Sequence, residues 1–228
     1  MSEYTGTFTD TIVVENSDEW ESVFPERIET DELVFSYLLE DATITEAWDF
    51  YSSNFGNEKF FNTSWRCPQT YQDTIDTFED IRGMFESNTD MFYSIRSQSG
   101  ELIGQATIED VDLHTGRCGI GIWLDESFWG QGLAQERAEG FLYAIFKEMP
   151  VDTVEIRVAV ENTPSIKSVL KYLDVFGGSF EGCFRNISIN PYRERLNMFV
   201  WSITETEFFD DDAEYSESVK KPSANIPE

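Results

Sequence analysis

The sequence is poor in residues that bind metals or cross-link a chain. Its 228 residues contain one histidine and three scattered cysteines, Cys67, Cys118 and Cys183, which form no CxxC pair. Because a structural zinc site takes about four nitrogen or sulfur ligands, this composition predicts a protein without a metal cofactor. Isolated cysteines are commonly reduced thiols in the core, and we expect mostly buried, unpaired cysteines here.

Long apolar runs and basic residues are also scarce. No stretch approaches the roughly 20 apolar residues that span a bilayer, and the start, MSEYTGTFTD, lacks the basic and apolar segments of a signal peptide. The sequence therefore predicts a soluble cytoplasmic protein with no membrane partner. Lys and Arg total 16 against 44 Asp and Glu, which gives a net charge of −28. Nonspecific DNA or RNA binding needs a basic surface, so we expect no nucleic-acid partner.

The acidity has two explanations. Either the whole surface is acidic because the cytoplasm is very salty, or an acidic tail binds a basic partner. The acidic residues are spread along the whole chain, which favours the first. At about 1 M salt the Debye length is about 3 Å, so repulsion between surface carboxylates is largely screened. We therefore infer a halophilic source.

The chain does contain enough large apolar residues for one substantial domain, including 19 Phe, 9 Tyr and 6 Trp. We predict a polar, acidic arm over residues 1–24, a folded domain over 25–209, and an acidic, disordered tail over 210–228. Hydrophobic spacing then predicts the elements of the domain. Strands are expected at 33–37, 91–97, 99–110, 118–124, 153–160, 179–187 and 196–203, and helices at 44–51, 70–85, 134–149 and 164–173, with Thr163 as the last helix's N-cap. This order predicts an α/β fold, a mixed sheet with helices on both faces.

A glycine-rich join connects the strand CGIGIWL to the helix after it. The join reads WGQGLAQE, from Trp129 to Glu136. A strand that ends at a glycine turn and feeds a helix presents free backbone N–H groups, which favour a phosphate or diphosphate. The alternative is a tight connection that needs only the unusual φ of glycine. The join is neither the dinucleotide GxGxxG nor a Walker A loop, because the third glycine and the GK[ST] are missing.

The join and four other segments together resemble the GNAT superfamily of acetyltransferases, and within it the RimJ/RimL-like ribosomal-protein N-acetyltransferases. Gly132 and Ala134 match the last two positions of the family's Q/R-x-x-G-x-G/A loop, whereas Trp129 replaces its Gln or Arg. The other likenesses fall in the family's order over residues 26–209: RIETDELVF, IWLDESFWGQGLAQERA, VEIRVAVENTPSIKSVL, SFEGCFRN and RLNMFVWSITETEF. The resemblance implies a mostly antiparallel, splayed central sheet and transfer of an acetyl group from acetyl-CoA to an amine.

The resemblance also implies which residues meet acetyl-CoA. Backbone groups near Ile122, Trp123 and Leu124 are expected to contact the pantetheine, and one N–H there would stabilise the developing oxyanion. The backbone N–H groups of the join are expected to hold the diphosphate, and they belong to Gln131, Gly132, Leu133 and Ala134.

The residues after the strand VEIRVAV have two interpretations each. Asn162 either contacts the cofactor or caps the following helix. Ser165 either protonates the leaving thiolate or is a first-turn serine satisfied by the backbone. Lys167 and Lys171, two of six lysines, either meet the 3′-phosphate or form a solvated face. Tyr172 resembles the family's proton donor, but extra residues before the Gly177-Gly178 turn favour a packing role.

The acceptor and the general base are left open by the sequence. Glu109, Asp110, Asp112 and His114 are the candidate bases, although surface exposure is the ordinary explanation for each. The leading acceptor is a protein N-terminal α-amine. A small-molecule amine remains an alternative, as does a non-catalytic protein that binds acyl-CoA. We expect a monomer or a homodimer.

Overall fold

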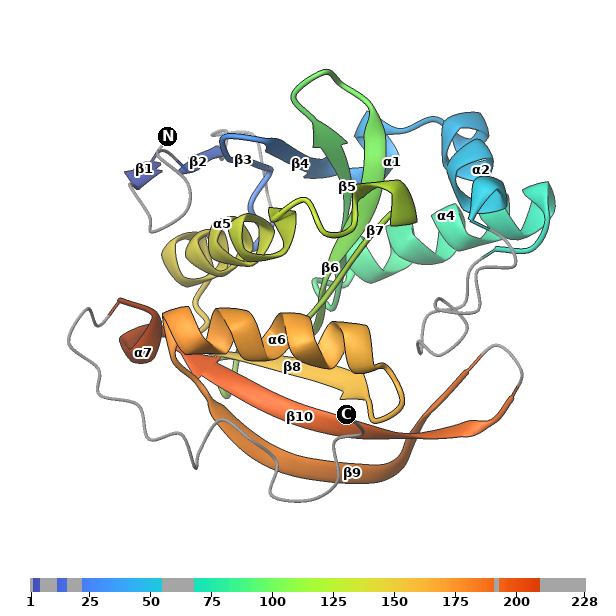
Figure 1. The fold of residues 1–228 in the computed structure, drawn as a ribbon. Helices are drawn as coiled ribbons and strands as arrows, with labels where there is room; N and C mark the ends of the chain where they lie inside the picture. Colours follow the sequence, from blue (N-terminus) through green and yellow to red (C-terminus); the bar gives the residue numbers. More distant parts are fainter. Residues whose placement is uncertain (1, 5–11, 16–21, 55–67, 191–192, 210–228) are drawn as a thin grey trace. The chain divides into compact units, whose positions relative to one another are not determined.

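A computed structural model of the chain describes residues 2–4, 12–15, 22–54, 68–190 and 193–209 (Figure 1). The chain forms two compact units. The first comprises residues 1–55 and 68–151, and the second comprises residues 56–67 and 152–228. The predicted tail, 210–228, and most of the predicted arm, 1–24, lie outside the described residues. Among the helices that the structure describes, none has the length and apolar character needed to cross a bilayer.

The first unit is built on an antiparallel sheet whose strands follow one another in chain order. These strands are β1 (Ser2–Tyr4), β2 (Ile12–Glu15), β3 (Arg27–Glu29), β4 (Leu33–Tyr37), β5 (Met91–Ser97), β6 (Leu102–Asp112) and β7 (Arg117–Leu124). The helices of this unit are α1 (Leu38–Asp41), α2 (Ile44–Ser53), α4 (Tyr71–Glu86), the short 3₁₀ helix η1 (Glu126–Phe128) and α5 (Leu133–Glu148).

Helices cover both faces of this sheet. On one face Phe141 of α5 packs against Phe35 and Tyr93, with ring centroids 5.5 and 5.4 Å apart. On the other face the Tyr51 hydroxyl of α2 donates a 2.9 Å hydrogen bond to Gln105 Oε1. Alternate residues of a strand point to opposite faces, so the period-two pattern of β4 to β7 is what separates the two layers.

The second unit pairs its strands in the order β8 (Thr153–Ala159), β10 (Arg195–Thr204) and β9 (Ser179–Ile189), again antiparallel. The helices of this unit are α6 (Thr163–Phe176) and α7 (Glu205–Phe209). Trp201 of β10 is fully buried, and Phe180 and Phe199 pack against its ring. The predicted α/β fold with mostly antiparallel strands and helices on both faces is thus confirmed.

One local prediction is wrong. Thr163 is the first residue of α6 and not its N-cap: Asn162 is the N-cap, and its side chain accepts the N–H of Ser165 at 3.3 Å. Asparagine outcompetes threonine as a cap because its carbonyl reaches the first-turn N–H groups readily. The expectation of mostly buried cysteines holds for one of the two cysteines that the structure describes. Cys118 is buried. Cys183 is exposed, because it lies on β9, an edge strand of the sheet. Cys67 lies outside the described residues.

Candidate functional site

The glycine join is a turn that only glycine adopts easily. Gly130 and Gly132 have φ angles of +76° and +89°, a left-handed conformation that costs side-chain-bearing residues roughly 1–2 kcal/mol. A Cβ at either position would meet no atom within 4 Å. The space beside both glycines is therefore open, and a ligand can approach the backbone there.

The helix that follows this turn begins without a side-chain cap. Gly132 is the N-cap of α5 and makes no side-chain cap hydrogen bond. Gln135 Nε2, in that turn, is buried without a hydrogen-bond partner. Unpaired donors at a helix N-terminus attract an anion. The arrangement fits the diphosphate of acetyl-CoA.

Two side chains of the join tie it to the residues before it. The Trp129 indole Nε1 donates to the carbonyl of Leu124 at 2.8 Å, and Gln131 Nε2 donates to the carbonyl of Ser127 at 2.9 Å. Trp129 thus ties the turn to the end of β7, which gives a structural role to the residue that departs from the family pattern.

A buried glutamate fixes the start of α5 on the sheet. Glu136 Oε1 accepts hydrogen bonds from Thr30 Oγ1 at 2.6 Å and from the Glu32 N–H at 2.8 Å. Burial raises the pKa of Glu136, although these two hydrogen bonds oppose the rise. Gly140, one turn later, allows the helix to approach closely, because a Cβ there would lie 2.6 Å from Thr30 Cγ2. The N-terminus of α5 is therefore held in place before any ligand binds.

The strand β7 carries the predicted pantetheine contacts beside aromatic rings. Ile122 pairs with Ala106 and Trp123 with Gln105 of β6. The Trp123 ring stacks on Phe50 of α2, with centroids 4.9 Å apart. The structure therefore brings Ile122, Trp123 and Leu124 together with the glycine join in the first unit, and α2 lies over this part of the sheet.

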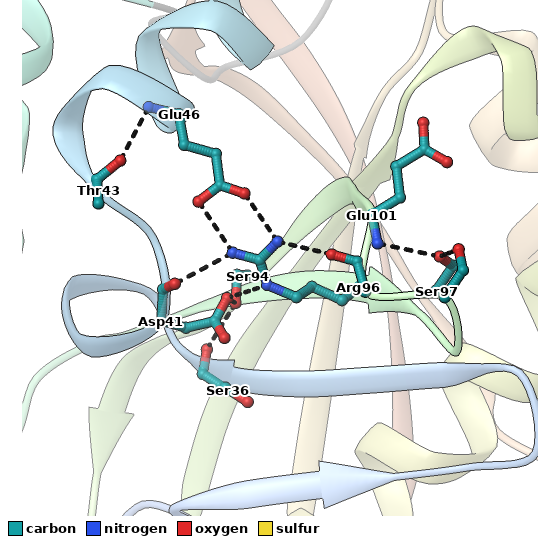
Figure 2. A network of polar contacts seen from close by, with 10 residues as sticks. Ser36, Asp41, Thr43, Glu46, Ser94, Arg96, Ser97 and Glu101 are labelled. Carbon is teal, nitrogen blue, oxygen red and sulfur yellow. Dashed lines mark hydrogen bonds and ion pairs between the residues drawn. The ribbon is translucent and has the colours of Figure 1, made fainter.

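The helix α2 is anchored by an arginine that the sequence analysis did not single out. Figure 2 shows Arg96 of β5 between Asp41 and Glu46. Its Nε donates to Asp41 Oδ2 at 2.6 Å, and its two terminal nitrogens donate to the Glu46 carboxylate at 2.8 and 3.0 Å. Hydrogen bonds to Glu46 and Asp41 raise the pKa of Arg96 despite its partial burial. One side chain thus holds α1 and α2 against the sheet.

The predicted residues of the second unit lie at the N-cap of α6 and along this helix. Asn162 caps the helix, as its alternative interpretation held, and the Ser165 side chain is half-buried. Lys167 and Lys171 are exposed, whereas Tyr172 is buried, which supports a packing role for Tyr172. Ser168 Oγ, three residues beyond Ser165, is buried without a hydrogen-bond partner, which nothing in the sequence predicted.

The four candidate bases occupy different environments around the β6–β7 turn. Asp112 and His114 are exposed. The Asp112 carboxylate accepts hydrogen bonds from Thr115 and the His114 N–H, which lower its pKa. Asp110 is exposed with a φ of +53°. Glu109 alone of the four is half-buried within a strand. Among the described residues, there is no group of three or more His, Cys, Asp or Glu side chains that could hold a metal ion.

Comparison with known proteins gives consistent matches. Residues 20–172 match a family model described as an acetyltransferase (GNAT) domain. The chain is 28% identical over 137 residues to the uncharacterized N-acetyltransferase p20 of Bacillus licheniformis, covering 60% of this chain and 73% of that one.

Solved structures with the same fold act on different amines. One is RimL, a ribosomal L7/L12 alpha-N-protein acetyltransferase in complex with coenzyme A, with a TM-score of 0.63, 17% identity and coverage of 76% of this chain and 94% of that one. Another is the spermidine N-acetyltransferase of Vibrio cholerae in complex with CoA and spermine, with a TM-score of 0.63, 12% identity and coverage of 78% and 98%. At these identities the likeness establishes the fold.

Proposed function

Since the chain belongs to the GNAT acetyltransferase family, we propose that it acetylates the N-terminal α-amine of a protein. The chain is an N-acetyltransferase whose cosubstrate is acetyl-CoA. The uncapped, glycine-led N-terminus of α5 is the observation that supports the cosubstrate site. The acceptor rests on amine chemistry: an α-amine has a pKa near 8 and a lysine amine near 10.4, so the α-amine is neutral far more often at pH 7. The RimL neighbour, an alpha-N-protein acetyltransferase, agrees with this choice.

In this proposal, different residues bind different parts of acetyl-CoA. Backbone N–H groups from Gln131 to Ala134 hold the diphosphate, and backbone groups of Ile122, Trp123 and Leu124 hold the pantetheine. Asn162, whose Oδ1 caps α6, keeps its amide Nδ2 as a donor to the cofactor, and Lys167 is exposed to meet the 3′-phosphate. Acetyl-CoA supplies the acetyl group as a thioester.

Ser165 is proposed to give a proton to the departing thiolate. A thiol has a pKa near 8.5 and its thiolate is a moderate leaving group, so a donor helps without being indispensable. We expect Ser165→Ala to lower kcat by about ten- to a hundredfold, the low end of general acid catalysis. Acetyl-CoA affinity should stay within a few fold. Measuring kcat, cofactor Kd and Tm on one preparation decides the role, because a serine that only packs would lower Tm and leave turnover intact.

A polyamine is the second candidate acceptor. The net charge of −28 attracts polycations by long-range electrostatics, and the neighbour from Vibrio cholerae is a spermidine N-acetyltransferase. Comparing kcat/KM for a peptide with a free N-terminus and for spermidine separates the two candidates. The proposed function requires the peptide to be preferred in molar salt, where charge attraction is screened.

The net charge of −28 supports a protein of a salty cytoplasm, and we propose that it is a monomer or a homodimer. We expect the chain to lose structure as salt is lowered from about 3 M to about 0.1 M, because repulsion between carboxylates is screened progressively less. Circular dichroism and Tm across that range are the measurements. An unchanged spectrum and Tm throughout would contradict the halophilic origin.

A further inference from the structure

Two glycines on β7 let polar side chains of β6 lie across the strand. Glu109 pairs with Gly119, and Thr107 pairs with Gly121. A Cβ at Gly119 would lie 3.0 Å from Glu109 Cγ and 3.4 Å from its Oε1, and a Cβ at Gly121 would lie 2.6 Å from Thr107 Oγ1. The bare backbone of β7 is therefore the surface on which the Glu109 carboxylate rests.

This pair lies on the face of the sheet that α2 covers. Alternate residues share a face, so Glu109 and Thr107 lie on the face of Gln105, and Gly119 and Gly121 lie on that of Trp123. On this face Tyr51 of α2 bonds to Gln105, and Phe50 stacks on Trp123. An amine that follows the aromatic rings along β7 thus meets the Thr107 hydroxyl first and the Glu109 carboxylate next.

The order of positions along β7 places this carboxylate beyond the predicted pantetheine contacts. The proposed diphosphate site begins at Gln131, and the pantetheine contacts run back through Leu124 to Ile122. The reactive end then points toward Gly121, one residue further, and Gly119, about 10 Å from Ile122 at some 3.3 Å per residue. The Glu109 side chain and the acceptor amine together span the distance between Gly119 and Ile122.

Other charged residues lie near Glu109. Arg117 lies two residues before Gly119 on β7, and Asp90 precedes β5, where its Oδ1 accepts the Asp110 N–H at 3.3 Å. Asp110 and Asp112 are exposed near the hairpin end. Of the three acidic residues at this end of β6, Glu109 alone is half-buried.

We propose that Glu109 is a catalytic residue that binds the acceptor amine and takes its proton, an assignment that rests on the proposed acetyl transfer. The Glu109 carboxylate takes a proton from the ammonium form of the acceptor, and the neutral amine then attacks the thioester carbon, so that the nitrogen–carbon bond forms and the carbon–sulfur bond breaks. The thiolate leaves with the electron pair of the broken bond and takes up a proton, which balances the second proton that the nitrogen loses, and Glu109 returns its own proton to solvent. The products are the acetylated amine and the free thiol of CoA, and one proton is released for each acceptor that arrives as an ammonium ion.

Glu109→Gln keeps the size and removes the base. We expect kcat/KM for the amine at pH 7 to fall about a hundredfold or more, with acetyl-CoA Kd and Tm unchanged. The deficit should shrink as pH rises above the amine pKa, near 8 for an α-amine, because the amine then needs no proton acceptor to become neutral. Gly119→Ala keeps the carboxylate but displaces it, and should give an intermediate loss. Asp110→Asn is the matched control: it removes an adjacent charge, and asparagine accepts the positive φ.

The experiment uses the full chain with acetyl-CoA and two acceptors, a peptide with a free α-amine and spermidine. Loss confined to Glu109→Gln and Gly119→Ala, and relieved at high pH, supports the assignment. Activity of Glu109→Gln within a few fold of wild type, an equal loss in Asp110→Asn, or a loss constant across pH overturns it. If wild type prefers spermidine, only the proposed α-amine acceptor is overturned. The ratio of kcat/KM between wild type and Glu109→Gln is then measured with spermidine as the acceptor. No turnover of either amine by wild type contradicts both proposals.

Discussion

Gly132→Trp is expected to lower acetyl-CoA affinity by about a hundredfold or more, the loss of two charge-assisted hydrogen bonds at about 1.5–3 kcal/mol each. Gly132 has a φ of +89° and open space where a Cβ would point. A tryptophan there fills the space beside the first turn of α5 and disfavours the left-handed turn that aims the N–H groups. Calorimetric titration of the folded variant with acetyl-CoA measures the effect.

A matched control separates strain from lost binding. Gly100 in the β5–β6 turn has a φ of +86° and equally open surroundings. Gly100→Trp therefore carries a similar conformational cost, roughly 1–2 kcal/mol of stability, without touching the glycine join. We expect wild-type affinity in Gly100→Trp. Wild-type affinity in Gly132→Trp as well would end the assignment of the join as the diphosphate site.

Arg96→Met is expected to destabilise the fold by about 3 kcal/mol, the lower end for breaking a buried ion pair. The Arg96 side chain is only 16% exposed, and the variant leaves Asp41, at 21%, and Glu46, at 40%, without their shared cation. The partial exposure of Glu46 lets water compensate that carboxylate, which is why the larger values are not expected. Urea unfolding at constant high salt measures the free energy of unfolding.

Arg27→Met is the companion variant for this measurement. Arg27 pairs with Glu29 at 3.1 Å, but the two side chains are 38% and 42% exposed. Exposed pairs contribute about 0–1 kcal/mol, so the two variants should differ by about 2 kcal/mol or more. Equal destabilisation would show that Arg96 does not act as the anchor of α1 and α2.

Periodicity predicted the long elements and missed the short ones. The apolar stripe of α5 and the alternation of β5 to β7 each repeat several times, so their type follows from the sequence. The strand β3 and the helices α1 and α7 have only three to five residues each, too few to establish a period. At α6 the cap was misplaced by one residue, because Asn162 and Thr163 are both capable caps and only geometry chooses between them.

For the site, too, features that are local in sequence were predictable and features that depend on distant contacts were not. The glycine join was predictable because its spacing is local. The Arg96 cluster was not, since Asp41 and Glu46 lie 55 and 50 residues away in sequence and meet it only through the strand register. Glu109 was one of 44 acidic residues, and its distinction comes from the pairing with Gly119. The buried polar atoms of Gln135 and Ser168 carry no sequence signal, because a single polar residue on a helix is ordinarily exposed.

Mass spectrometry of an acceptor peptide tests the central claim, acetyl transfer to a protein α-amine, most directly. Peptide with a free N-terminus and one internal lysine is incubated with the protein and acetyl-CoA in molar salt, beside the same peptide with its N-terminus blocked. We expect the free peptide to gain the mass of one acetyl group, located by fragmentation at its N-terminus, and only when acetyl-CoA is present. The blocked peptide should stay unmodified. Acetyl-CoA binding without acetylation of the free peptide, or acetylation of the lysine in both peptides, would contradict the account.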